Sequence, residues 1–317
     1  MPGFTATDAM VCALMITLRV PQLPLLALPL LALACAPKPV PTEAPREPVA
    51  EAPAEDAEDA AGAPVGGSIE AALAGAHRSE GNLARDEQRH PMETLTFFGL
   101  TPEMTVVELW PGGGWYTQVL AGTVYGAGKL ITTNFDVNAS TDPKDYRVRV
   151  GTAFADMLKS SPIYEGVETV TVTDPKSLTL APEGTVDMVL TFRNSHGWVE
   201  DGTATMIYTA AFTALRPGGV LGVVQHRAKA DDDRDPKIIA DSGYVREDYL
   251  IETIEAVGFK LEEKSEINAN PNDTKDYEKG VWTLPPNFQL KDVDREKYAA
   301  IGESDRMTLR FVKPAAG

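Results

Sequence analysis

Three consecutive glycines at 112–114 constrain the fold of this chain more than any other feature of its sequence. The residues before them, 105–109, form a short apolar run that contains Glu108, and the residues after them, 115–124, form an amphipathic run. This pattern predicts a strand, a tight turn and the start of a helix. Glycines let a ligand approach the backbone closely, and the free N–H groups of a helix start face the strand end. The turn is therefore a candidate ligand site.

The residues around the turn narrow the kind of ligand. A dinucleotide-binding fingerprint requires one glycine where Thr117 stands and another where Trp110 stands. A Walker phosphate-binding loop requires Gly-Lys followed by Ser or Thr, and that sequence does not follow these glycines. Glu108, four positions before the first glycine, suits a ligand with a positive end, such as the amino group of an amino-acid moiety.

Net charge and cysteine content argue against nucleic acid as a partner and against cysteine-based sites in the folded part. The 317 residues carry a formal net charge of −17, which argues against nucleic acid because phosphate binding needs a basic surface. The two cysteines, Cys12 and Cys35, both lie in the first 35 residues. We therefore expect neither a disulfide nor a thiolate metal site in the folded part of the chain.

Residues 1–35 resemble a signal peptide that ends in a lipoprotein cleavage site. The apolar run 23–34 has 12 residues, fewer than the roughly 20 of a spanning helix, and it ends in small residues before Cys35. Lipidation of Cys35 would anchor the protein at the periplasmic face of a bacterial envelope, and the same ending also suits plain secretion. Residues 36–67 are rich in proline, alanine and acidic residues, which predicts a disordered tether before a folded domain at 68–317.

Beyond the tether, strand and helix patterns alternate and predict a doubly wound, mostly parallel α/β sheet. The predicted strands are 105–109, 130–133, 167–173, 186–192, 220–224, 259–267 and 307–312, and helical patterns include 91–98, 142–160, 203–215 and 245–257. Five rounds of strand then helix imply right-handed crossovers with helices on both faces. No strong helix joins the last two strands, so we expect an antiparallel hairpin at one edge.

Polar residues follow several of the predicted strands, where ligands of such sheets bind. Asn134 and Asp136 follow the second strand, at the position that usually holds ribose hydroxyls, and Asp174 follows the third. Asp136 and Asp174 are also suited to begin turns. The polar loop 193–198 follows the fourth strand, and His226 ends the fifth.

Two segments outside the sheet are further candidate site elements. Residues 84–90 are either a solvated helical face or a lid folded over the glycine turn. The segment 268–303 is long for a hairpin connection and contains Trp282. Connections of that length are usually functional or disordered.

The layout, with an acid-ended glycine turn after the first strand, resembles the class I S-adenosylmethionine-dependent methyltransferases, whose seven-stranded sheet has an antiparallel last strand. A closer resemblance covers residues 76–317 and is to a family of exported bacterial proteins described as predicted methyltransferases. The segments that carry it are 77–79, 84–86, 89–91, 108–117, 191–194, 266–271, 280–286 and 302–307. The resemblance implies S-adenosylmethionine (S-adenosyl-L-methionine) as the cofactor and methyl transfer as the activity.

By position, the resemblance implies that the glycine turn holds the methionine part of the cofactor, Asn134 or Asp136 the ribose, and Asp174 the adenine. The predicted cofactor-binding residues are Glu108, Trp110, Gly112, Gly113, Gly114, Asn134, Asp136, Asp174 and Arg193. The chain departs from the class at Trp110 and Pro111, where a glycine and a small residue are usual. A proline at 111 predicts an extended conformation for Trp110, which would alter the approach to the methionine end.

Methyl transfer from a sulfonium is an in-line displacement, so the protein mainly aligns the acceptor and excludes water. An oxygen or nitrogen acceptor also needs a base near neutral pH, a role that suits histidine. The predicted catalytic residues are His196, Asn194 and His226, although each histidine also suits a structural hydrogen-bonding role. Arg193 and Asn194 could orient an acidic or amide-bearing acceptor. The spacings of histidines and acids lack a specific metal-binding pattern, so no metal is predicted.

Together these features predict an S-adenosylmethionine-dependent methyltransferase that acts on a small-molecule or envelope-linked acceptor. The alternative is an exported module of the same fold that binds a nucleoside-like or other small ligand without catalysis. A third reading is a tethered interaction protein of the envelope. The predicted partners are a small-molecule acceptor and, through the lipid anchor, the membrane, with no nucleic acid.

Overall fold

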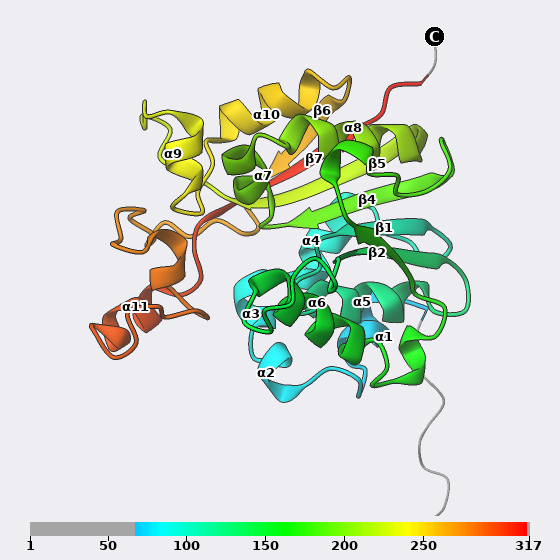
Figure 1. Cartoon of the computed structure of the whole chain (residues 1–317), viewed down its shortest axis with the longest axis horizontal. Helices are drawn as coiled ribbons and strands as arrows, with labels where there is room; N and C mark the ends of the chain where they lie inside the picture. The colour runs from blue at the N-terminus through cyan, green and yellow to red at the C-terminus, as the bar shows by residue number, and fades with distance from the viewer. Residues whose placement is uncertain (1–66, 316–317) are drawn as a thin grey trace, which may run out of the picture. The chain divides into compact units, whose positions relative to one another are not determined.

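A seven-stranded sheet forms the centre of the computed structural model, which describes residues 67–315 (Figure 1). The strands are β1 (Thr105–Leu109), β2 (Lys129–Phe135), β3 (Glu168–Val172), β4 (Val186–Phe192), β5 (Leu215–His226), β6 (Lys260–Ser265) and β7 (Arg306–Val312). Their order across the sheet is β3-β2-β1-β4-β5-β7-β6. The predicted signal peptide with Cys35, and the predicted tether apart from Gly67, lie outside the described residues.

The strand directions confirm the predicted fold class. The strands β1 to β5 pair in parallel, and β7 is antiparallel to both β5 and β6. The last two strands form the expected hairpin, with β6 at the edge and β7 inserted beside β5. Because β7 runs against its neighbours, its amino end lies at the edge of the sheet where β1, β4 and β5 have their carboxyl ends.

Helices cover both faces of the sheet (Figure 1). One face packs on α1 (Ile69–Leu73), α4 (Pro91–Phe98), α5 (Trp115–Val124) and α6 (Tyr146–Met157), and the other on α7 (Ser195–Asp201), α8 (Ala204–Ala214) and α10 (Glu247–Glu255). Val106 belongs to one core and Val107 to the other, because successive strand side chains point to opposite faces. Burial on both faces explains the nearly continuous apolar runs of β1 and β4.

Shorter helices lie at the ends of the sheet. They are α2 (Glu80–Leu83), α3 (Asp86–Arg89), α9 (Pro236–Ala240) and α11 (Arg295–Ile301), with single turns η1 (Pro162–Tyr164), η2 (Pro175–Ser177) and η3 (Gly280–Thr283). None of the helices within residues 67–315 is long and apolar enough to cross a membrane.

The fifth strand is longer than predicted, which corrects the expected boundary between helix and strand. We expected Pro217 and its neighbours to end a helix at 215, but α8 ends at Ala214 and β5 begins at Leu215. The pairing of β4 with β5 shifts register between Val186 and Met188, opposite this stretch. A bulge of this kind accommodates a proline, which has no N–H to donate to a ladder.

The expected polar loop after β4 is also corrected, because most of it is helix α7. Trp198 and Val199 of this helix are buried in the core beneath α8. Packing of these two side chains in the core stabilises α7, whereas the polar sequence of residues 193–198 predicts a loop.

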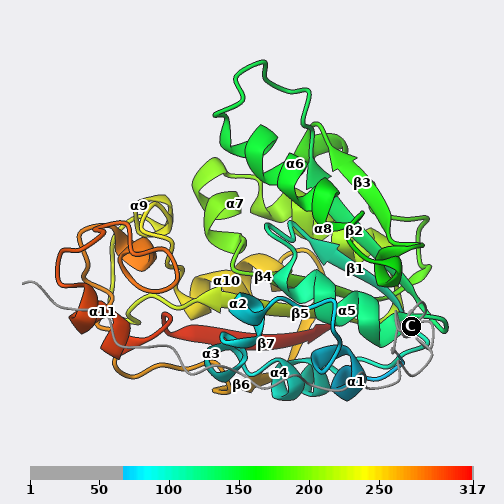
Figure 2. The same cartoon turned by 90° about the horizontal axis from the view of Figure 1, so that it is seen from below.

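The long segment before β7 is ordered and lies beside α9 at one end of the sheet in both views (Figures 1 and 2). The Asn270 side-chain amide donates to the carbonyl oxygens of Ile301 (2.8 Å) and Glu303 (2.7 Å), which ties the start of the segment to its end. Trp282 reaches the same edge of the sheet as the glycine turn. The segment is therefore part of the candidate site.

Candidate active site

A cavity of about 700 Å³ lies beyond the carboxyl ends of β1, β4 and β5. Its wall comes from the glycine turn, from residues of α2 and α3, from the starts of α6 and α7, and from Trp282. The cavity thus occupies the position at which open α/β sheets bind ligands. Of the predicted site residues, those that line it are Trp110, Gly112, Gly113, Arg193, Asn194, His196 and His226.

The three glycines have different roles in the turn. Gly112 and Gly114 have φ of +59° and +77°, values that favour glycine, and the Gly114 N–H donates to the Pro111 carbonyl (3.0 Å). A Cβ on Gly114 would lie 2.3 Å from Met157 Cε, so this glycine allows α6 to pack against the turn. A Cβ on Gly112 or Gly113 would meet no atom within 4 Å. These two glycines leave the backbone open to the cavity, and Gly114 does not line it.

Trp110 is not extended, contrary to the expectation from Pro111. Its φ is +46°, in the left-handed region that non-glycine residues rarely adopt. The Trp110 N–H donates to Thr133 Oγ1 (2.7 Å), and its carbonyl accepts from Asn194 Nδ2 (3.1 Å). The indole also packs edge-to-face on Trp198, with ring centroids 5.1 Å apart. These contacts hold Trp110 in its strained conformation. The preference of a residue before proline for an extended conformation does not predict them.

Glu108 points into the protein and not into the cavity. The side chain is 1% exposed, and the Thr117 hydroxyl of α5 donates to its Oε2 (2.5 Å). Burial raises the pKa of Glu108 to about 8, against the opposing effect of the Thr117 hydrogen bond. Glu108 therefore joins β1 to α5 as a largely protonated acid, and the structure does not support a direct contact with the amino group of a ligand.

The three predicted ribose and adenine residues do not line the cavity either. Asn134 Nδ2 donates to the Gly151 carbonyl (3.0 Å), Asp136 accepts from the Asn138 N–H (2.9 Å), and Asp174 accepts from the Lys176 N–H (2.9 Å). Asn134 thus ties β2 to the interior of α6, whereas Asp136 and Asp174 each close a local turn. The residues that reach the cavity from β2 and α6 are Phe135, Tyr146 and Arg147.

Asn194 is placed at the cavity by contacts with the backbone. Its Nδ2 donates to the carbonyl oxygens of Leu109 (2.9 Å) and Trp110 (3.1 Å) and lies 3.2 Å from Thr191 Oγ1. The side chain connects the end of β4 to the end of β1. Asn194 therefore holds these two strand ends together at the cavity, and its catalytic role stays a prediction.

The two predicted catalytic histidines are neighbours, with ring centroids 5.9 Å apart. Burial lowers the pKa of His196 to about 4, and burial, together with His196 and Arg193, lowers the pKa of His226. His226 Nδ1 lies 2.5 Å from Ser304 Oγ, and His196 Nδ1 lies 3.4 Å from Gln225 Nε2. Both imidazoles are therefore neutral at pH 7. Within residues 67–315, no three His, Cys, Asp or Glu side chains lie close enough together to hold a metal ion.

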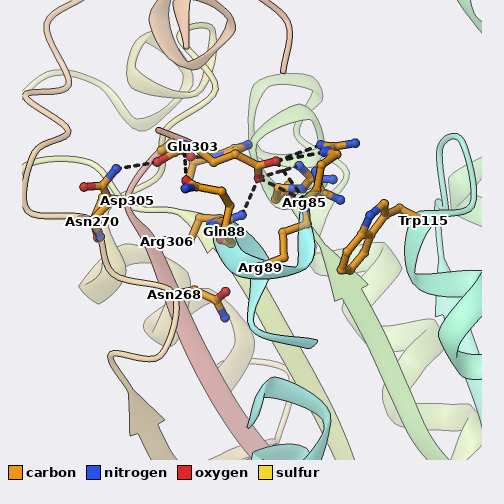
Figure 3. A network of polar contacts seen from close by, with 12 residues as sticks. Arg85, Gln88, Arg89, Trp115, Asn268, Asn270, Glu303, Asp305 and Arg306 are labelled. Carbon is orange, nitrogen blue, oxygen red and sulfur yellow. Dashed lines mark hydrogen bonds and ion pairs between the residues drawn. The ribbon is translucent and has the colours of Figure 1, made fainter. Parts of the chain in front are cut away.

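A cluster of arginines surrounds Glu303, and we did not predict it from the sequence (Figure 3). Three of these arginines, Arg85, Arg89 and Arg193, line the cavity. Glu303 Oε1 accepts from Arg85 (3.0 Å) and Arg89 (3.1 Å), Oε2 accepts from Arg306 (2.8 Å), and Arg193 Nη1 lies 3.7 Å from Oε2. Burial alone would raise the pKa of Glu303, but the arginines outweigh it and lower the pKa to about 2. We refer to these five side chains as the arginine cluster.

The arginine cluster decides between the two readings of the segment 84–90. Arg89 is 1% exposed, and its guanidinium carbon lies 4.6 Å from the Trp115 ring centroid. Arg85 and Arg89 both line the cavity next to the glycine turn. The segment therefore covers the site through Arg85 and Arg89, while Ala84, Glu87 and Gln88 are exposed on its other side. The only sequence signal was the motif resemblance at 84–86, 89–91 and 302–307, which assigned no role to these residues.

Comparisons with protein-family models and with curated proteins found no match. Among solved structures, a SAM-dependent methyltransferase from Aquifex aeolicus is 16% identical over 73% of this chain and 93% of that chain, with a TM-score of 0.46. A glycopeptide N-methyltransferase is 14% identical over 71% and 95% of the two chains, with a TM-score of 0.45. A protein described as a possible exported protein, from Bordetella parapertussis, is 15% identical over 73% and 68%, with a TM-score of 0.43. The similarity between these structures and this chain is one of fold.

Proposed function

We propose that this protein is a methyltransferase that takes a methyl group from S-adenosylmethionine and passes it to a small-molecule or envelope-linked acceptor in the same cavity. The observation that carries the proposal is the open backbone at Gly112 and Gly113, where an added Cβ would meet no atom within 4 Å. This backbone faces a cavity of about 700 Å³, within the usual range for small-molecule sites. The motif resemblance to methyltransferases supports the same ligand.

The cavity wall suits the two ends of this cofactor. The methionine end would lie over Gly112 and Gly113, and the adenosine would extend toward Phe135 and Tyr146. The rings of Phe135 and Tyr146 meet edge-to-face, with centroids 5.9 Å apart, and offer an apolar surface to a base. When bound, the cofactor supplies the activated methyl group, and the residues of the chain orient the acceptor and exclude water.

His196 and His226 supply the acid–base function on the acceptor side of this proposal. Both line the cavity, and both are neutral at pH 7 because burial lowers their pKa. A neutral imidazole has a nitrogen that accepts a proton. Attack on the methyl group makes the acceptor's own proton strongly acidic, so even a weak imidazole base removes it.

Replacing Gly113 with valine is expected to weaken cofactor binding about tenfold or more without unfolding the protein. Gly113, unlike Gly112 and Gly114, is outside the left-handed region, so an L-residue is tolerated there. The valine side chain would extend into the space that the methionine end requires. Calorimetry of the purified protein with S-adenosylmethionine and its demethylated product should show binding by the wild type, weakened about tenfold or more in Gly113→Val.

Gly81→Val is the matched control for this experiment. Gly81 also has no atom within 4 Å of an added Cβ, and it lies in α2 outside the cavity wall. The control should bind both compounds like the wild type. Absence of heat from the wild type at millimolar concentrations of either compound would refute the proposed cofactor. Binding without turnover of acceptors from an envelope extract would instead favour the non-catalytic module.

We also propose export and lipid anchoring at Cys35, which rest on the sequence alone. Cys35→Ser is expected to move most of the protein from the membrane fraction to the soluble fraction, because the lipid is attached through the thiol and provides the anchor. Cell fractionation followed by immunoblotting measures this change. Cys12→Ser is the control and should stay with the membrane. An unchanged distribution of Cys35→Ser would contradict the lipoprotein assignment.

A further inference from the structure

The arginine cluster is incompletely paired. Arg89 Nε donates to both oxygens of Glu303 (3.1 Å each), but Nη1 and Nη2 have no hydrogen-bond partner within residues 67–315, although the residue is 1% exposed. Arg85 and Arg193 add two guanidinium groups to the same wall, each with 26% of its side chain exposed. Four guanidinium groups thus share one carboxylate. Buried charged donors without acceptors are costly, so this wall is suited to a further anion.

The cluster lies at one end of the cavity, beside the histidines. Arg193 follows β4, and its N–H donates to the Val224 carbonyl of β5 (2.6 Å), two residues before His226. Arg306 begins β7 and pairs in register with His226. Phe135 and Tyr146 come from β2 and the following helix. Three inter-strand spacings, about 14 Å, separate β2 from β5 in the sheet. The cluster is therefore distant from the proposed adenosine end. Arg193 and Arg306 adjoin the histidines of the proposed acceptor end, and Arg85 and Arg89 lie next to the glycine turn.

We propose that the methyl acceptor carries an oxyanion, a carboxylate or a phosphate, that binds to Arg89, Arg193 and Arg85. The planar guanidinium group presents paired donors that match both kinds of oxyanion. Glu303 already occupies one side of the cluster as a carboxylate, which shows that these groups are oriented for such a partner. This assignment of the acceptor rests on the proposed methyltransferase function, whereas the oxyanion site itself does not.

Two further features suit this role. Trp115 packs on the Arg89 guanidinium, 4.6 Å from ring centroid to guanidinium carbon, and fixes its orientation (Figure 3). The chain as a whole has a formal net charge of −17, which repels free anions from most of its surface. A local cationic wall within an acidic protein therefore selects ligands that place their negative charge at this point.

The test is titration of the full-length protein at low ionic strength with inorganic phosphate and with succinate, followed by calorimetry and by Trp fluorescence. We expect at least one of the two probes to bind, and Arg193→Gln to weaken that binding by about tenfold or more. Arg193→Lys should recover part of the loss. Arg193 is preferred to Arg89 because it is less buried, so its replacement disturbs the fold less.

Arg147→Gln is the matched control, because Arg147 lines the same cavity at the β2 end and pairs with Asp145. It should leave binding of the probe unchanged. Absence of binding by both probes, or equal losses in Arg193→Gln and Arg147→Gln, would overturn the oxyanion site.

A second titration separates the acceptor from the cofactor. In the presence of saturating S-adenosylhomocysteine, the demethylated cofactor, the Arg193-dependent binding of the probe should persist. Competition between the two would assign the arginines to the carboxylate of the cofactor and overturn the acceptor proposal. Arginine-dependent binding of the probe together with no binding of S-adenosylhomocysteine would refute the proposed function and its acceptor, while the oxyanion site would stand.

Discussion

Glu303→Gln is expected to lower the free energy of unfolding by about 3–5 kcal/mol at pH 7, the usual cost of removing one partner from a buried ion pair. The substitution keeps the shape of the side chain and removes its charge. It leaves the guanidinium groups of Arg85, Arg89 and Arg306, together with nearby Arg193, without their common carboxylate. Urea unfolding followed by far-ultraviolet circular dichroism, in buffers free of phosphate and sulfate, measures the loss.

The pH dependence of this loss follows from the depressed pKa of Glu303, which is about 2 in the folded protein against an ordinary value of 4.5. A carboxyl with a lowered folded-state pKa stabilises the protein fully above its unfolded-state value, and the stabilisation disappears as pH falls through the folded value. The difference between wild type and Glu303→Gln should therefore be constant from pH 7 to about 5 and shrink below that. A loss that is the same at pH 3 and pH 7 would contradict the charge-based explanation.

Glu108→Gln is expected to have the opposite effect and to raise the free energy of unfolding, by up to about 3 kcal/mol at pH 7. Burial raises the pKa of Glu108 to about 8, so the folded protein must keep this acid protonated at a pH where the unfolded chain ionises it. Glutamine has no such requirement, and its carbonyl oxygen can accept the hydrogen bond from Thr117.

The pH window for Glu108 differs from that for Glu303, which makes the two variants controls for each other. Glu108 has a pKa of about 4.5 in the unfolded chain and about 8 in the folded protein. An acid with a raised folded-state pKa destabilises the protein increasingly as the pH rises from the first value to the second. The advantage of Glu108→Gln should therefore grow from about pH 4.5 to about pH 8, remain constant above that, and vanish near pH 4. The same urea series measures it, and an advantage that persists at pH 4 would show that packing and not ionisation is responsible.

These two glutamates also show what the sequence could not reveal. Both are acids close to the predicted site, yet Glu108 is buried against one threonine and Glu303 is surrounded by arginines. We expected Glu108 to meet the ligand because it ends a strand before a glycine turn. Successive side chains of a strand point to opposite faces, and Glu108 lies on the face that points into the protein. There its carboxyl group accepts a hydrogen bond from Thr117 of α5.

The sequence by itself determined the succession of strands along the chain and the directions in which they pair. It also determined the turn at 112–114 and the positions of Arg193, His196 and His226 at or just beyond strand ends. These features depend on local patterns: alternation of apolar residues, helical periodicity, and glycines with positive φ. Parallel strands place their carboxyl ends at one edge, so side chains after β4 and β5 must meet there.

Only the tertiary structure decided which side chains form the walls of that site. Arg85 and Glu303 are 218 positions apart in the chain, and no periodic pattern links them. Asp136 and Asp174 follow strands as expected, but the backbone N–H groups two residues further along occupy their oxygens. The left-handed conformation of Trp110 likewise depends on Thr133, Asn194 and Trp198. Charge pairing, burial and strain depend on neighbours in space, and the folded chain alone supplies those neighbours.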